Sequence, residues 1–139
     1  MFESVCNEMK ILTNDKSTYI VDYFSKFGNI KALITLKCML SNISSAKSLH
    51  LDSTFKIDKA NYPVIVAGVS DINRYFIHMA LAVVSLDNKH SYAWLLETML
   101  KELQNFNLLF NIKNIVADGA QQISNAIKKV LPLASRTNC

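Results

Sequence analysis

The chain has 139 residues, of which 50% are apolar and 19% are charged, and its formal net charge is +4. This length corresponds to one domain, and the apolar fraction excludes a wholly disordered protein because it suffices for a sizeable core. The mildly basic charge permits a nucleic-acid partner but does not establish one. Apolar runs are shorter than the roughly 18 residues of a membrane-spanning helix, so we expect a soluble intracellular protein without membrane association.

The cysteines form no recognisable framework. Cys6, Cys38 and Cys139 are an odd number, widely spaced, without a C-x-x-C pair. This pattern predicts a reducing compartment and no structural disulfide. We expect Cys6 and Cys38 to be ordinary buried or half-buried thiols.

The first third of the chain is predicted to be a helical segment, residues 1–48, upstream of the main domain. In residues 18–41, apolar side chains recur at spacings of three and four, which predicts a helix interrupted at Gly28-Asn29. The serine-rich stretch 41–48 is predicted to be a loop.

After residue 48 the pattern changes to that of strands. Residues 49–56 alternate between apolar and polar side chains, and residues 64–69 form a short apolar run. Residues 75–85 are apolar on both faces, which predicts a strand covered on both sides. We expect turns at 58–63 and 71–74.

The remainder, up to residue 139, alternates between helix and strand. Residues 88–105 carry an uninterrupted helical stripe of apolar side chains, with Asp87 or Asn88 as the cap. A strand at 112–117 and a second helix at 120–130 follow.

The predicted domain 49–139 is therefore an α/β unit in the order β-β-β-α-β-α, with a mixed sheet and helices packed on it. Ribonuclease-H-like folds share this order. In that architecture the first strand is central, and the fourth lies beside it in parallel after a right-handed crossover.

Two aspartates are the candidate site. Asp52 lies in the middle of the first predicted strand, and Asp118 follows the fourth. If these strands are parallel neighbours, both carboxylates face one crevice, an arrangement that suits Mg²⁺ ions acting on a phosphodiester. Two simpler hypotheses remain open: Asp118 is a helix N-cap, and Asp52 is a surface residue on an edge strand.

Other side chains have simpler interpretations. His50 shares the face of Asp52 and is either part of the site or a structural histidine. Trp94 lies within the helical stripe and is predicted to be core. Glu97 and Lys101 have the spacing of an ion pair, and Lys128-Lys129 is a short basic spot.

Several motifs between Leu49 and Cys139 resemble the catalytic domain of Mutator-like element (MULE) transposases. Residues Asp52 to Lys56 resemble the D-[GS]-T-[FY]-K signature with which the family's catalytic domain opens. Further similarities, in the family's order and spacing, are Tyr62-Pro63-Val64, Ser91-Tyr92-Ala93-Trp94-Leu95-Leu96, Ile115-Val116-Ala117-Asp118-Gly119-Ala120, Ile127 to Pro132, and Arg136-Thr137-Asn138-Cys139.

The resemblance implies a DDE-type DNA transposase that cleaves and transfers DNA strands with Mg²⁺ or Mn²⁺. Asp52 would be the first metal-binding carboxylate and Asp118 the second. The family's third acid, a glutamate, lies beyond the second aspartate, and this chain ends before it, which implies a truncated ribonuclease-H-like core. Cys139 resembles the first residue of a C-x-x-H element, which implies a Zn²⁺ ligand in a longer protein.

The implied partners are transposon ends and target DNA, in a nuclear homo-oligomer. With two of three acids, the chain is not expected to cut DNA by itself, so whether it is an enzyme stays open. The alternative is a non-enzymatic DNA- or protein-binding remnant of a domesticated transposase. An unrelated α/β domain with capping aspartates is the third hypothesis.

Overall fold

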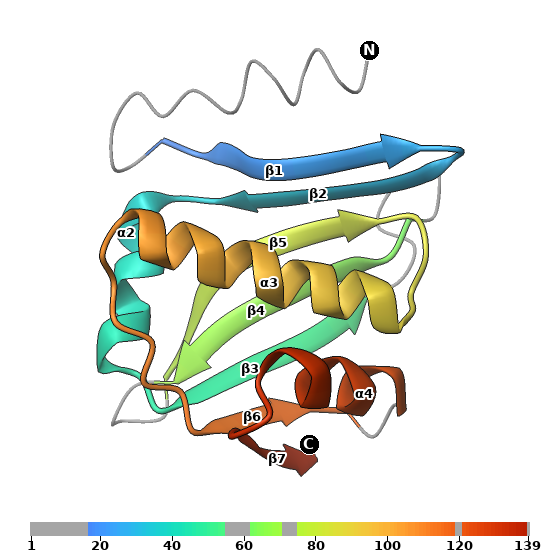
Figure 1. Cartoon of the computed structure of the whole chain (residues 1–139). Helices are drawn as coiled ribbons and strands as arrows, with labels where there is room; N and C mark the ends of the chain where they lie inside the picture. The colour runs from blue at the N-terminus through green and yellow to red at the C-terminus, as the bar shows by residue number, and fades with distance from the viewer. Residues whose placement is uncertain (1–16, 55–61, 71–74, 119–120, 139) are drawn as a thin grey trace.

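The computed structural model describes residues 17–54, 62–70, 75–118 and 121–138. Figure 1 shows a twisted sheet with helices packed in front of it. The elements in chain order are β1 (Tyr19–Lys26), β2 (Asn29–Thr35), α2 (Lys37–Leu40), the 3-10 helix η1 (Ser41–Ser45), β3 (Ser48–Thr54), β4 (Val64–Ser70), β5 (Phe76–Val84), α3 (Lys89–Asn105), β6 (Asn114–Ala117), α4 (Gln121–Val130) and β7 (Ser135–Asn138).

The predicted helix over residues 18–41 is wrong, because β1 and β2 form an antiparallel hairpin there. The break expected at Gly28 is the hairpin turn, where Phe27 and Gly28 have positive φ angles of 52° and 77°. A bulge between Ile20 and Asp22 shifts the alternation of the first strand. Apolar side chains on the two sides of the bulge therefore imitate helical spacing.

The seven strands form one mixed sheet in the order β1-β2-β5-β4-β3-β6-β7. The pairs β3–β6 and β6–β7 are parallel, and the other neighbouring strands are antiparallel. The central position of β3 beside a parallel β6 agrees with the prediction. The hairpin joins the same sheet, which therefore extends across the predicted boundary at residues 48–49. Because β3, β5 and β6 run in the same direction, their carboxyl ends meet at one edge of the sheet.

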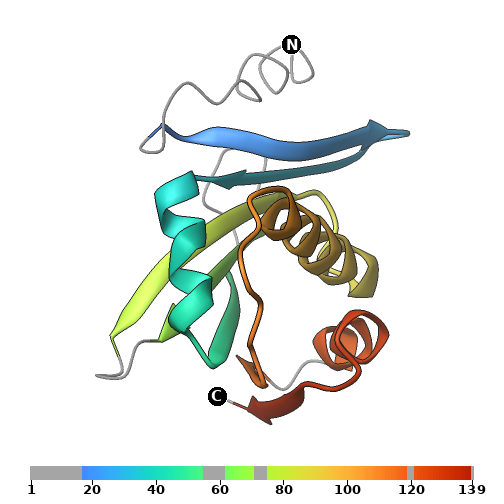
Figure 2. The same cartoon turned by 60° about the vertical axis from the view of Figure 1, so that its left-hand side comes forward.

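The helices α3 and α4 pack beside each other on one face of the sheet (Figures 1 and 2). The helix predicted at 88–105 is confirmed as α3. Its N-cap is Asn88, whose Oδ1 accepts a hydrogen bond of 3.0 Å from the backbone N–H of Ser91. This bond satisfies a backbone donor that the first turn cannot pair internally.

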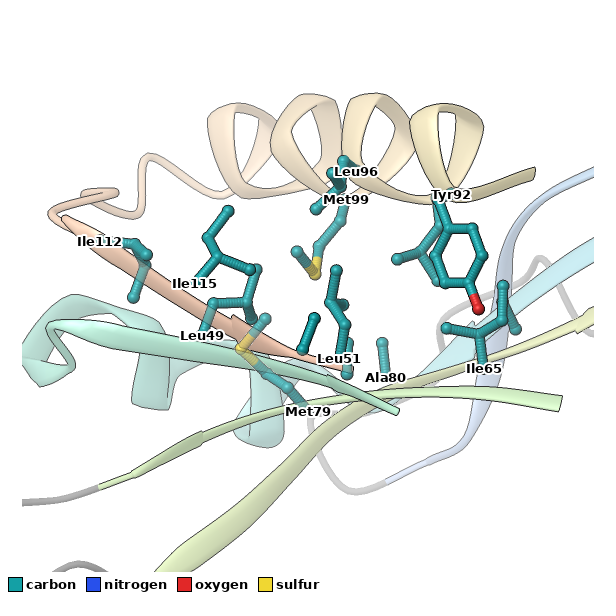
Figure 3. Packing of buried hydrophobic residues seen from close by; sticks show 14 of the residues in the cluster. Leu49, Leu51, Ile65, Met79, Ala80, Tyr92, Leu96, Met99, Ile112 and Ile115 are labelled. Carbon is teal, nitrogen blue, oxygen red and sulfur yellow. The ribbon is translucent and has the colours of Figure 1, made fainter. Parts of the chain in front are cut away.

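The main core lies between α3 and the sheet. Figure 3 shows Leu96 and Met99 of α3 above Leu49, Leu51 and Ile115 of the sheet. All five are at most 1% exposed. The odd-numbered residues of β3 therefore face α3, and its even-numbered residues face the opposite side of the sheet.

The opposite face is covered only in part. The short helix α2 contacts β5 there, and a cavity of about 260 Å³ separates Leu36 and Met39 from Val66 and Leu81. Phe76 and Leu81 of β5 are 44% and 36% exposed. The prediction that this strand is covered on both faces is therefore wrong, since α2 is too short to extend across it.

The other predicted strands and the second helix are confirmed, with ends that differ by a few residues. The loop predicted at 41–48 contains η1, and β7 was not predicted. Residues 58–61 and 71–74, where turns were expected, lie outside the described residues. Across the described ranges, no helix combines the length and the apolarity needed to span a membrane.

Candidate functional site

The two candidate aspartates follow paired positions on neighbouring parallel strands. The register of β3 and β6 ends with Leu51 opposite Ala117, and the next residues are Asp52 and Asp118. Adjacent strands lie about 4.8 Å apart. The sheet therefore brings the backbones of the two aspartates to neighbouring positions, and both residues are exposed.

The simpler hypotheses for these aspartates have different outcomes. β3 lies between β4 and β6, so Asp52 is not on an edge strand. Whether Asp118 caps α4 stays open, because residues 119 and 120, which join it to the helix, lie outside the described residues.

Tyr92 connects several polar groups at this edge of the sheet. It extends from the first turn of α3 toward the sheet and is 1% exposed (Figure 3). Its phenol is hydrogen-bonded to Ser53 of β3 and to Asp87 after β5. Burial, with the charges of Asp87 and Asp118, raises the pKa of Tyr92 to about 12, although the bond to Ser53 acts in the opposite direction. A neutral phenol thus ties α3 to the edge where the carboxylates lie.

Asp87 and Arg136 were missed as site residues. Asp87 also accepts a hydrogen bond of 3.4 Å from Gln122 Nε2, which joins the β5–α3 connection to α4. The Arg136 guanidinium donates to the backbone carbonyl of Asp118. The position of Asp87 directly after a strand parallel to β3 was a usable signal. Arg136 lies in one of the motifs that resemble the family, but that motif does not predict its contact with Asp118, which depends on β7.

His50 packs into a small aromatic group on the face opposite α3. Its Nε2 is hydrogen-bonded to Ser70, and its ring meets Phe76 edge-on at 5.7 Å between centroids. Phe76 in turn meets His78 at 4.8 Å. Burial lowers the pKa of His50, which favours the neutral ring. These partners support the structural interpretation of His50.

For the remaining side chains considered in the sequence analysis, some predictions are confirmed, one is wrong and some lie outside the described residues. Trp94 is partly buried and packs against the core, as predicted. Glu97 Oε1 of α3 lies 4.0 Å from Lys129 Nζ of α4. Cys38 is exposed, so the prediction of a buried or half-buried thiol is wrong for it. Cys6 and Cys139, and with Cys139 the proposed Zn²⁺ ligand, lie outside the described residues.

The donor set at the edge of the sheet fits a hard cation. Among the described residues no group of three or more His, Cys, Asp or Glu side chains is placed to hold a metal. Mg²⁺, however, is commonly held by one or two carboxylates while it keeps several waters. Asp52 and Asp118, exposed and on neighbouring strands, meet that lower requirement.

The buried phenol predicts a pH dependence of stability. The pKa of Tyr92 in the folded protein, about 12, lies above its ordinary value of 10.0. Its contribution to the free energy of unfolding is therefore complete below pH 10 and is lost as the pH rises toward 12. We expect Tyr92→Phe to reduce this loss, measured by urea unfolding at pH values below 10 and near 12.

The matched control is Tyr75→Phe, the same change at a residue that is 70% exposed. It should leave the alkaline loss of stability unchanged. An equal loss in wild type and Tyr92→Phe would show that the phenol does not titrate as described.

Comparison with known proteins gives one family. The model of the MULE transposase domain matches residues 48–139, about two thirds of the chain. No curated protein matches the chain. The matched region begins at the first residue of β3 and includes Asp52, Tyr92, Asp118 and Arg136. Together with the order of elements and the motifs along it, this match shows that the chain belongs to the MULE transposase family.

Proposed function

We propose that this domain takes part in DNA transposition by binding a divalent cation and DNA at the edge of its sheet. The observation that carries the proposal is the parallel register of β3 and β6, which brings Asp52 and Asp118 to neighbouring positions in a member of a transposase family. Transposon ends and target DNA are the proposed partners, and the nucleus is the proposed compartment.

The fold that we propose for the matched region is ribonuclease-H-like. The order β5-β4-β3-β6-β7 supports it, because the first strand of the region, β3, is central and lies parallel to the strand that follows α3. The long helix α3 supplies the crossover that a parallel neighbour requires.

Asp52 and Asp118 are the proposed ligands of Mg²⁺ or Mn²⁺. When bound, such an ion stabilises negative charge on a phosphodiester as a Lewis acid. The chain itself contributes the placement of the carboxylates. Arg136 holds the backbone of Asp118, and Tyr92 holds Ser53 next to Asp52. Both contacts restrict the strand ends from which the carboxylates project.

A metal titration followed by thermal unfolding tests this proposal. A cation that binds only the folded chain should stabilise it by about 2.7 kcal/mol at one hundred times its dissociation constant. We expect Mn²⁺ or Mg²⁺ to raise the unfolding temperature of the wild type. The Asp52→Asn, Asp118→Asn double variant should show no such rise.

Asp22→Asn is a matched control, because it removes a carboxylate from β1 at the far edge of the same sheet. It should keep the metal-dependent rise. If the double variant responded to metal as the wild type does, Asp52 and Asp118 would not be the ligands, and the proposal would be wrong.

The described residues offer two neighbouring carboxylates and no third metal-binding side chain, which favours a second candidate function. The domain would then bind DNA without cleaving it. Retention of labelled DNA by the wild type in EDTA, with no strand cleavage after Mn²⁺ is added, would favour this alternative. Metal-dependent cleavage that is lost in the double variant would favour the enzyme.

A further inference from the structure

A cavity lined by Lys128 and Arg136 has the properties of an anion site. It measures about 460 Å³ and lies between α4, the turn after it and β7. Figures 1 and 2 show α4 packed over β6 and β7 at this end of the sheet. The lining residues are Ser124, Ile127, Lys128, Leu131, Pro132, Ala134 and Arg136. Both ionisable side chains among them are cations.

The donors come from two opposite walls. On α4, Ser124 and Lys128 are four residues apart and therefore lie on the same face of the helix, one turn from each other. On β7, Arg136 pairs with Ile115, which is buried on the face that carries the helices. Directly paired residues share a face of the sheet, so Arg136 rises from the sheet toward α4.

Arg136 has more donors than the protein uses. A guanidinium group carries five N–H donors in a planar fork. One nitrogen donates to the Asp118 carbonyl. Its Nε is buried and has no hydrogen-bond partner among the described residues. An unpaired buried donor is costly, and an oxyanion in the cavity would satisfy it.

The neighbouring lysine differs in its surroundings. Lys129 is directed toward α3, where its Nζ lies 4.0 Å from Glu97. Lys128 lines the cavity, and none of the described residues that line it carries a carboxylate. Adjacent lysines of the same helix thus face different partners, and only Lys128 is placed to meet an anion in the cavity.

We propose that this cavity binds a backbone phosphate of DNA, with Lys128, Arg136 and Ser124 as donors. The inference rests on the proposed function for the identity of the ligand. The contact between Arg136 and the Asp118 carbonyl links the cavity to the carboxylate edge.

The salt dependence of DNA binding tests the proposal. The logarithm of the DNA-binding constant falls linearly with the logarithm of the salt concentration. Each lost phosphate contact makes this slope less steep by about 0.9 for duplex DNA. We would titrate the full chain with a labelled duplex in EDTA, between about 50 and 200 mM salt, and follow fluorescence anisotropy. The Lys128→Gln, Arg136→Gln double variant loses the one phosphate contact and should make the slope less steep by about 0.9, and Lys128→Gln alone should account for part of that change.

The matched control is Lys129→Gln, which changes the net charge equally on the same helix. Its slope should equal that of the wild type. Equal losses in Lys128→Gln and Lys129→Gln would show a response to net charge alone and overturn the proposal, as would absence of DNA binding by the wild type. Because Lys128 is exposed, circular dichroism should show an unchanged fold. The metal titration above contains no DNA, so the two proposals can fail separately.

Discussion

Replacing Leu51 by alanine should lower the free energy of unfolding by about 2–5 kcal/mol, the usual cost of a buried Leu→Ala change. Leu51 is 1% exposed and lies in the central strand, opposite Ala67 of β4 and Ala117 of β6. Its two neighbours within the sheet are alanines, which are too small to fill the space that the change would leave. Urea unfolding followed by circular dichroism measures the loss.

Leu109→Ala is the control, since Leu109 is 68% exposed. Its effect should remain within about 0.5 kcal/mol. Similar losses in the two variants would contradict the packing described for β3.

Gly68→Ala is expected to cost about 1–3 kcal/mol, the range for overpacking. Gly68 lies opposite His50 on one side and His78 on the other. A Cβ there would lie 2.6 Å from Cε2 of Phe76 and 2.8 Å from the carbonyl oxygen of Ile77. The ring can rotate away, whereas the backbone oxygen moves only if β5 moves. Urea unfolding of the variant measures the cost.

A double-mutant cycle with Phe76→Ala separates the two contacts. Without the ring, the cost of Gly68→Ala should fall but not vanish, with a coupling of about 0.5–3 kcal/mol between the two sites. An unchanged cost would mean that the ring does not occupy the space above Gly68. Complete loss of the cost would mean that the carbonyl of Ile77 is not a barrier.

The sequence was a good guide wherever one pattern held without interruption. The stripe of α3 and the alternation of β3 predicted their elements, and the crossover between them predicted the parallel pair β3–β6. The same reasoning failed for β1, where a bulge between Ile20 and Asp22 disguised the alternation. The aromatic and β-branched residues of that segment, such as Tyr19 and Val21, favour strands and were the stronger signal.

At the candidate site, the sequence could predict positions but few partners. The adjacency of Asp52 and Asp118 follows from strand order, which local patterns encode. The contacts of Tyr92 with Ser53 and Asp87 join three elements, and their geometry depends on how α3 lies on the sheet. For Arg136, the family-like motif from Arg136 to Cys139 marked the segment but did not predict the contact with Asp118. Its strand, β7, has only four residues and lies at the edge of the sheet beside β6. So short a segment shows no periodicity from which a strand could be predicted.

The parallel pairing of β3 with β6 also constrains the order of folding. Two strands and a long helix separate these partners in the chain, whereas β1–β2 and β4–β5 can form as local hairpins. Closing so long a loop costs chain entropy that is recovered only when the strands dock, and such non-local pairings slow folding. We therefore expect the two aspartates to become neighbours late, when the centre of the sheet closes. Opening of that one strand pair would separate them again while both hairpins persist.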